Sequence, residues 1–204
     1  MNMFLYVLDT LADWEISFLI AEINSGRYFK KSIEKPQIIK VANNLNPIKT
    51  MGGIEIIPEI DVDNMNLKNG DFVVLPGADT WLNGNNQKII DKIKGNKDII
   101  IAAICGATMA LAENGILDNK KHTSIDKEYL KMVCKNYNGE NLYEYKPVVV
   151  DENVITAAGI APLEFTFEVI KKMNVMETAT LTAWYNLFKT NEQKYFFELM
   201  KSIE

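Results

Sequence analysis

Residues 99–108 read Ile-Ile-Ile-Ala-Ala-Ile-Cys-Gly-Ala-Thr, and this stretch decides the fold class of the chain. Ile99–Ile104 is the most hydrophobic run in the sequence, which is typical of a parallel strand covered on both faces. A helical pattern over Thr108–Asn114 follows almost at once, and Gly115 is suited to end it. A buried strand that turns directly into a helix is the repeating unit of a parallel α/β sheet.

The same alternation of short apolar runs and helical patterns extends over the rest of the chain. Strands are expected at Phe4–Leu8, Gln37–Val41, Phe72–Leu75, His122–Ile125, Pro147–Val150 and Val154–Ala157, with a small hairpin or an edge strand between Pro47 and Pro58. Helices are expected at Glu15–Asn24, Gln87–Lys94, Lys127–Val133 and Leu163–Met173. The pattern predicts a doubly wound, mostly parallel sheet with helices on both faces.

Two further helices are expected at the end of the chain, over Glu177–Lys189 and Glu192–Ile203. We therefore divide the 204 residues into a domain at 1–175 and a C-terminal helical extension at 176–204 that packs on the same domain. An apolar stripe in the last helix (Phe196, Leu199, Met200, Ile203) indicates core cover first and a dimer contact second.

Composition excludes several classes of function. A net charge of −5 without a Lys/Arg stripe argues against nucleic-acid binding. The first apolar run is too short to span a membrane and has no basic region before it, so we expect a cytoplasmic protein. Two cysteines form no disulfide framework, and a single histidine leaves no His-rich metal site. Without a phosphate loop or dinucleotide fingerprint, we expect neither a metal nor a cofactor.

Cys105 occupies the turn between the hydrophobic strand and its helix. Such a sharp turn brings the residues two places before and after it close together, and here both are small, Ala103 and Ala107. This is the logic of the nucleophile elbow of hydrolases, with cysteine at the apex. A helix N-terminus lowers a thiol pKa, and its N–H groups, Gly106 first, can stabilise an oxyanion or an oxidised sulfur. The alternative is that Cys105 is a small buried hydrophobe.

The sequence around this cysteine resembles the DJ-1/PfpI superfamily, which shares the class I glutamine amidotransferase-like fold. The matching stretches cover about residues 4–175 in order and spacing. They are Phe72–Ala78 followed by Trp81, Ile101–Ala107, Gly115–Asp118 before His122–Ser124, and Thr156–Gly159, with Glu15 at the position of the family's acidic residue. The resemblance implies a flavodoxin-like sandwich and commonly a homodimer.

The resemblance also implies roles for individual residues. Cys105 becomes the nucleophile or redox centre, and Glu15 its proton partner. Read without the resemblance, Glu15 is a solvated first-turn carboxylate, and Asp13 is a competing acid that is also suited to cap the helix. The implied oxyanion pocket comes from the backbone, and three more residues are accessory candidates. The pocket residues are Gly77, Ala78 and Gly106, and the accessory candidates are His122, Trp81 and Gly159.

The chain departs from the family pattern at its histidines. Many members carry a histidine three residues beyond the position of His122, where this chain has Ile125, and protease-like members carry one in place of Gly106. Strand alternation would put His122 and Ile125 on opposite faces, so His122 does not simply substitute. A peptidase is therefore disfavoured, as is a glutaminase, whose elbow sequence and His-x-Glu pair do not occur. We expect Cys134 to be a buried packing residue without a chemical role.

Three functions stay open from the sequence. The first is an enzyme that uses Cys105 and Glu15 on a small electrophile such as an α-oxoaldehyde, in glyoxalase-, deglycase- or hydratase-type chemistry. The second is a redox or stress-response protein whose cysteine is oxidised. The third is a ligand-binding module without chemistry. The partner is accordingly a small-molecule substrate or an oxidant, with no nucleic acid and no membrane.

The nucleophile elbow and the expected roles of Cys105 and Glu15 lead to predictions about geometry and reactivity. Cys105 should have a positive φ, because an elbow requires it. The Glu15 carboxyl should lie within hydrogen-bond range of the Cys105 sulfur, and His122 should not. Cys105 should also alkylate faster at neutral pH than an ordinary cysteine, and faster than Cys134.

Overall fold

The computed structural model describes residues 1–203; Glu204, the last residue of the expected extension, lies outside them. Its main sheet has seven strands in the order β5-β2-β1-β6-β7-β9-β8, all parallel except for the antiparallel β8–β9 pair. The strands are β1 (Asn2–Tyr6), β2 (Gln37–Ala42), β5 (Ile60–Asp61), β6 (Phe72–Leu75), β7 (Ile100–Ile104), β8 (Val148–Asp151) and β9 (Val154–Ala157). This confirms the predicted fold class.

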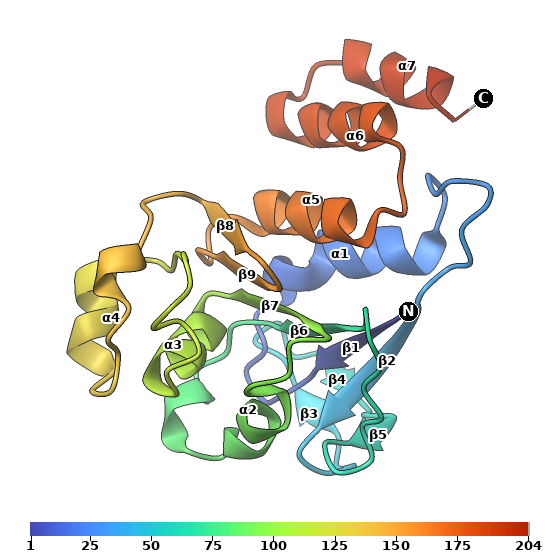
Figure 1. Cartoon of the computed structure of the whole chain (residues 1–204). Coiled ribbons are helices and arrows are strands. Elements are labelled where there is room, and N and C mark those ends of the chain that lie inside the picture. Colours follow the sequence, from blue (N-terminus) through green and yellow to red (C-terminus); the bar gives the residue numbers. More distant parts are fainter. Residues whose placement is uncertain (204) are drawn as a thin grey trace.

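Helices cover both faces of this sheet (Figure 1). Helices α1 and α5 lie on one side, with α6 and α7 as a further layer beyond α5, while α2 and α3 lie on the other side with α4 next to α3. Their bounds are α1 (Asp13–Ser25), α2 (Gln87–Ile93), α3 (Gly106–Glu113), α4 (Lys127–Val133), α5 (Pro162–Met173), α6 (Thr178–Thr190) and α7 (Lys194–Lys201). Short 3-10 turns occur at Trp81–Asn83 and Glu140–Leu142.

The centre of the sheet is dry because the central strands are apolar on both faces. Every residue of β6 is buried, and only Ile100 of β7 is partly exposed. At about 25 cal/mol per Å² of buried apolar surface, such strands supply much of the favourable free energy of folding. The order β1-β6-β7-β9 also places the candidate site, because the carboxyl ends of these four parallel neighbours meet at one edge.

Two sequence expectations about local structure are wrong. His122–Ile125 forms no strand; His122 makes only an isolated bridge to Tyr143, because neighbouring side chains and not a full ladder satisfy this segment. Asp13 does not cap α1, since the cap is Ala12 and the Asp13 carboxylate instead accepts a hydrogen bond from the Gly52 N–H at 2.7 Å. The small hairpin is confirmed, with β3 (Ile48–Lys49) paired to β4 (Glu55–Ile56).

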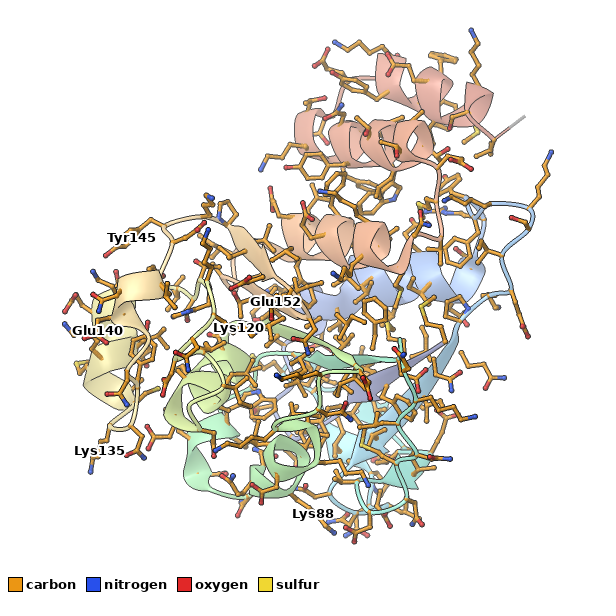
Figure 2. The ribbon with its side chains drawn as sticks, in the orientation of Figure 1. Lys88, Lys120, Lys135, Glu140, Tyr145 and Glu152 are labelled. Atoms are coloured by element: carbon orange, nitrogen blue, oxygen red, sulfur yellow. The ribbon has the colours of Figure 1, made fainter. Side chains whose placement is uncertain are left out.

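The end of the sheet away from Cys105 is closed by a charged turn between β8 and β9. Glu152 lies there in the left-handed region, with φ of 49°, and forms an ion pair with Lys120. Both side chains are labelled in Figure 2, on the same side of the molecule. Exposed pairs of this kind contribute up to about 1 kcal/mol, so this contact orients the turn more than it stabilises the fold.

The C-terminal helices attach to the sheet layer through a buried polar contact. The Trp184 side chain of α6 is fully buried, and its indole N–H donates to Glu22 Oε1 of α1 at 3.1 Å. Arg27 forms an ion pair with the same carboxylate. Because Glu22 is itself buried, these two donors supply the hydrogen bonds that water would otherwise give its carboxylate.

Replacing Trp184 with phenylalanine should therefore lower the free energy of unfolding by about 1–3 kcal/mol, the usual effect of removing one partner of a buried charged group. Urea unfolding followed by circular dichroism measures it. Trp14→Phe is the matched control, since Trp14 is 53% exposed and should change stability by no more than about 0.5 kcal/mol. Equal losses in the two variants would contradict the role of the Glu22 contact.

Candidate functional site

The Cys105 turn is a strained elbow. Its φ of 57° and ψ of −125° are rare for a residue with a side chain, and α3 begins at the next residue, Gly106, two positions earlier than the sequence pattern indicated. The Cys105 N–H donates to the Ala157 carbonyl at 3.0 Å, and the Thr108 hydroxyl donates to the Cys105 carbonyl at 2.6 Å. The positive φ confirms the predicted elbow geometry.

Glu15 reaches the elbow from the first turn of α1. One oxygen, Oε2, accepts a hydrogen bond from the Gly77 N–H at 2.6 Å. The other oxygen, Oε1, faces the thiol, and apart from that thiol it has no hydrogen-bond partner among residues 1–203. The carboxyl group is only 1% exposed, so it is a buried acid aimed at the sulfur and not the solvated carboxylate of the alternative reading.

Glycines make this close approach of thiol and carboxyl geometrically feasible. A Cβ on Gly77 would lie 2.6 Å from Glu15 Oε2 and 2.8 Å from Cys105 Cβ. A Cβ on Gly159 would lie 2.6 Å from Cys105 Sγ and 3.2 Å from Glu15 Oε1. Gly106 meets the Ala78 backbone in the same way. Gly159 therefore approaches the sulfur, and Gly77 and Gly106 approach Glu15 and the elbow, at distances that only glycine allows.

The predicted oxyanion pocket needs one correction. The Gly77 N–H is taken by Glu15, so it holds the carboxyl in place and is not free to bind a substrate oxygen. The Gly106 N–H instead contacts the sulfur, and the Ala78 N lies 3.4 Å from the position that a Gly106 Cβ would take. The Gly106 N–H, with the Ala78 N–H near it, is what remains of the predicted pocket.

Of the accessory candidates, Trp81 and Gly159 belong to the site and His122 does not. The Trp81 ring packs against Gly106, and its indole N–H donates to the Pro76 carbonyl at 2.7 Å, so it acts as a wall. Both ring nitrogens of His122 are engaged elsewhere, Nδ1 with the Lys120 carbonyl at 2.7 Å and Nε2 with the Tyr137 hydroxyl at 2.6 Å.

The cavity around the sulfur has a volume of about 340 Å³. Ile125, at the position where many family members carry a histidine, lines it, together with Ser124 and Tyr129. Asp79 also lines it, a residue that the sequence analysis passed over although it follows Gly77 and Ala78 directly. Within residues 1–203 no group of three or more His, Cys, Asp or Glu side chains could hold a metal ion.

The acidity of the thiol differs from the sequence expectation. Burial first, and then the neighbouring Glu15 carboxylate and the Asp79 charge, raise the pKa of Cys105 to about 12 against the lowering effect of the Gly106 N–H. The helix N-terminus is therefore outweighed by desolvation and like charge. The prediction of a low thiol pKa, and of fast alkylation at neutral pH, is not supported by this geometry.

Cys105 and Glu15 instead form a coupled pair. Burial raises the pKa of Glu15, while hydrogen bonds from the Gly77 N–H and the Cys105 thiol lower it less. Two acids that interact this closely titrate as a unit. A proton that moves from sulfur to Glu15 leaves the net charge of the pair unchanged and removes the carboxylate that opposes the thiolate. Of the two forms of the pair that share one proton, only the form with a protonated Glu15 contains a thiolate.

Glu15 should reduce stability at neutral pH. Because its pKa is raised in the folded protein, the unfolded chain loses this proton first, and the free energy of unfolding falls as pH rises from about 4.5 through the folded pKa. Glu15→Gln should then raise the free energy of unfolding at pH 8 by about 0.5–2 kcal/mol. Thermal unfolding at both ends of this pH range measures it. The stability gained by Glu15→Gln should shrink near about pH 4, where the glutamic acid and the glutamine that replaces it are both neutral. A melting temperature at pH 8 that is lower for Glu15→Gln than for the wild type would contradict a raised pKa of Glu15.

Cys134 provides an internal reference thiol. It lies at the C-terminal cap of α4, not in the helix interior as expected, and its Sγ donates to the Met109 carbonyl at 3.4 Å. It is 2% exposed, and burial raises its pKa to about 11. The packing role predicted for it fits this environment.

Fold and site together define a class: a doubly wound α/β protein with a cysteine at a nucleophile elbow and a buried carboxylic acid at its sulfur. The DJ-1/PfpI family model matches residues 1–172, and the chain belongs to this family. The chain is 48% identical to the "Uncharacterized protease YoaZ" of Bacillus subtilis over 99% of its length and 97% of the relative's. It is 35% identical to the "Uncharacterized protease YdeA" of the same organism over 78% and 77% of the two chains.

Solved structures agree with the fold. A thiJ/pfpI family protein from Bacillus anthracis superposes with a TM-score of 0.97 at 51% identity, covering 99% of this chain and 96% of its own. The DJ-1 superfamily protein Atu0886 from Agrobacterium tumefaciens gives 0.80 at 26% identity, with 94% and 99% covered. None of the helices within residues 1–203 is long and apolar enough to cross a membrane.

Proposed function

We propose that this protein uses Cys105 and Glu15 to act on small carbonyl electrophiles of the α-oxoaldehyde type. The observation that carries the proposal is the buried Glu15 carboxyl beside the Cys105 thiol, at the base of an open cavity of about 340 Å³. A nucleophile with a general acid in contact is the minimum that addition to a carbonyl requires.

The first step is addition. Sulfur passes its proton to Glu15, the thiolate forms a bond to the aldehyde carbon, and the carbonyl oxygen takes the proton back from Glu15 as its π electrons move onto it. The product is a hemithioacetal. The N–H groups of Ala78 and Gly106 stabilise the oxygen while its negative charge develops.

Glu15, again a carboxylate, then takes the proton from the aldehyde-derived carbon and passes it to the neighbouring ketone oxygen, which gives an enediol. The proton of the original hemithioacetal hydroxyl next moves by way of Glu15 to the former ketone carbon, as the C=O bond forms at the carbon that carries the sulfur. This converts the hemithioacetal into a thioester of a 2-hydroxy acid. Water cleaves the thioester and restores the thiol. The sum is oxoaldehyde plus water to 2-hydroxy acid, so the reaction needs no external oxidant or reductant. Deglycase- and hydratase-type reactions would use the same addition step.

A peptidase is disfavoured although two relatives carry the word protease in their names. A Cys–His pair would need an imidazole at the sulfur. The single histidine is instead held by the Lys120 carbonyl and the Tyr137 hydroxyl. Burial also lowers the pKa of His122, so that it is a neutral structural group.

Oxidation is the second candidate, and Glu15 Oε1 favours it. This buried oxygen faces the sulfur without another partner among residues 1–203, so a protonated Glu15 could donate to a sulfinate. Two equivalents of peroxide would convert the thiol to the sulfinic acid and release two waters. The raised thiol pKa opposes this route, because peroxide attacks the thiolate.

The test is consumption of methylglyoxal by the purified full chain, with the 2-hydroxy acid detected by NMR. Cys105→Ser should abolish it, and Cys134→Ser should not. Product formation by Cys105→Ser would refute the proposal. Mass spectrometry after mild peroxide tests the second candidate, which predicts a gain of two oxygens at Cys105 and none at Cys134. The homodimer implied by the family resemblance stays a prediction, which light scattering can check.

A further inference from the structure

The cavity around Cys105 carries charge of one sign. Two carboxyl groups line it, Glu15 at the sulfur and Asp79 in the loop after β6. None of the described residues that line it is a lysine, an arginine or a histidine. The Asp79 charge reaches the sulfur, since it contributes to the raised pKa of Cys105.

The rest of the wall is apolar and larger than a three-carbon aldehyde needs. Trp14, Leu82, Ile125 and Tyr129 line the cavity, although each is between 40% and 53% exposed. Trp81 closes the wall beside the elbow and is buried. Half-exposed aromatic and branched side chains around a pocket mark a surface that an apolar ligand can cover.

We propose that the cavity selects uncharged electrophiles with an apolar substituent, such as an aryl or branched-alkyl α-oxoaldehyde, and that Asp79 is the residue that rejects anionic ones. The choice of an α-oxoaldehyde as the electrophile rests on the proposed function. The charge selectivity of the cavity does not depend on that function. A carboxylate-bearing compound such as glyoxylate would bring a second or third negative charge next to Glu15 and Asp79, with no cationic side chain in the described wall to offset it.

Apolar substituents gain from the same wall. The aryl group of phenylglyoxal can cover the Trp14, Leu82 and Ile125 side chains, and removing that apolar surface from water favours binding. The methyl group of methylglyoxal leaves most of that surface wet. The reacting carbonyls of the two compounds are alike, so the Ala78 and Gly106 donors serve both.

Two alkylating reagents of nearly equal size test the charge selectivity without any turnover: iodoacetamide, which is neutral, and iodoacetate, which is an anion. Peptide mass spectrometry gives the rate constants of both reagents at Cys105. The measured quotient is the rate constant of iodoacetamide over that of iodoacetate at Cys105, divided by the same ratio for N-acetylcysteine. We expect this quotient to be about fivefold or more. Asp79→Asn should lower it about two- to fivefold, the size of one partly screened charge at a cavity rim.

Asp98→Asn is the matched control. Asp98 precedes β7 at the end of the sheet opposite Cys105, it is exposed, and its replacement removes the same charge. The Asp79 effect should also fade between about 0.01 M and about 1 M salt, as the Debye length falls from about 30 Å to about 3 Å. A quotient near one, or equal effects of Asp79→Asn and Asp98→Asn, would overturn the proposal.

A gain of function completes the test. Ile125 is 49% exposed in the cavity wall, so Ile125→Lys can add an ammonium group without opening the core. It should raise the iodoacetate rate constant at least as much as Asp79→Asn does, and a lower iodoacetate rate would count against the proposal. Under the proposed function, kcat/KM for phenylglyoxal should exceed that for glyoxylate by about tenfold or more. Charge-selective alkylation without aldehyde turnover would overturn the proposed function and leave the selectivity of the cavity standing.

Discussion

Replacing Glu15 with glutamine should slow the turnover of an α-oxoaldehyde by about 10²- to 10⁴-fold, the usual contribution of a positioned general acid–base group. The same substitution should speed simple alkylation of Cys105. The Glu15 charge raises the pKa of the thiol, so its removal lowers that pKa. Each unit of lowering gives tenfold more thiolate at neutral pH, offset by lower intrinsic nucleophilicity, for a net gain of about threefold.

Slower turnover together with faster alkylation is the result that a role of Glu15 in proton transfer predicts. Asp13→Asn is the control, because Asp13 lies two residues earlier in α1 but binds the Gly52 N–H and does not face the thiol. Turnover is measured by NMR, and alkylation by iodoacetamide is followed from pH 6 to about pH 12. The wild-type alkylation rate should still be rising at high pH, because the thiol pKa is about 12. Parallel losses in both assays would mean that Glu15 only supports the local structure.

Replacing Gly159 with alanine should remove most of the activity by displacing the sulfur. The new Cβ would lie 2.6 Å from Cys105 Sγ and 2.8 Å from Cys105 Cβ, and a rotation of the thiol relieves only the first contact. The elbow or the loop after β9 must therefore shift. A displacement of about 1 Å costs on the order of 10² in rate, and overpacking of this kind costs about 1–3 kcal/mol of stability.

Gly95→Ala is the control that separates the effect of backbone strain from the effect of displacing the Cys105 sulfur. Gly95 has a φ of 77°, but a Cβ there would meet no atom within 4 Å. Its replacement should lower stability by about 1–2 kcal/mol and leave turnover unchanged. Chemical denaturation and the methylglyoxal assay measure the two effects. An active Gly159→Ala would show that the sulfur does not need the position it has in this structure.

Local sequence determined the elbow and the layers around it. Ile99–Ile104 is apolar at every position, so it had to become a covered central strand, and β7 occupies that place. Ala103 and Ala107 are small enough for the turn, and Cys105 has the positive φ that such a turn imposes. These features follow from residues that are neighbours in the chain, which is why a reading of periodicity and side-chain size could predict them. The placement of Glu15 needed the family resemblance as well.

Tertiary structure alone decided the chemistry of the site. Gly77 lies 62 residues from Glu15, and only the pairing of β1 with β6 brings its N–H to the carboxyl and removes it from the oxyanion pocket. Burial by several elements, together with the carboxylates of Glu15 in α1 and Asp79 in the loop after β6, raises the thiol pKa that the helix N-terminus alone would lower. The Tyr137 hydroxyl likewise holds His122 away from the sulfur. Desolvation and hydrogen-bond partners are set by contacts distant in sequence, so no local pattern could supply them.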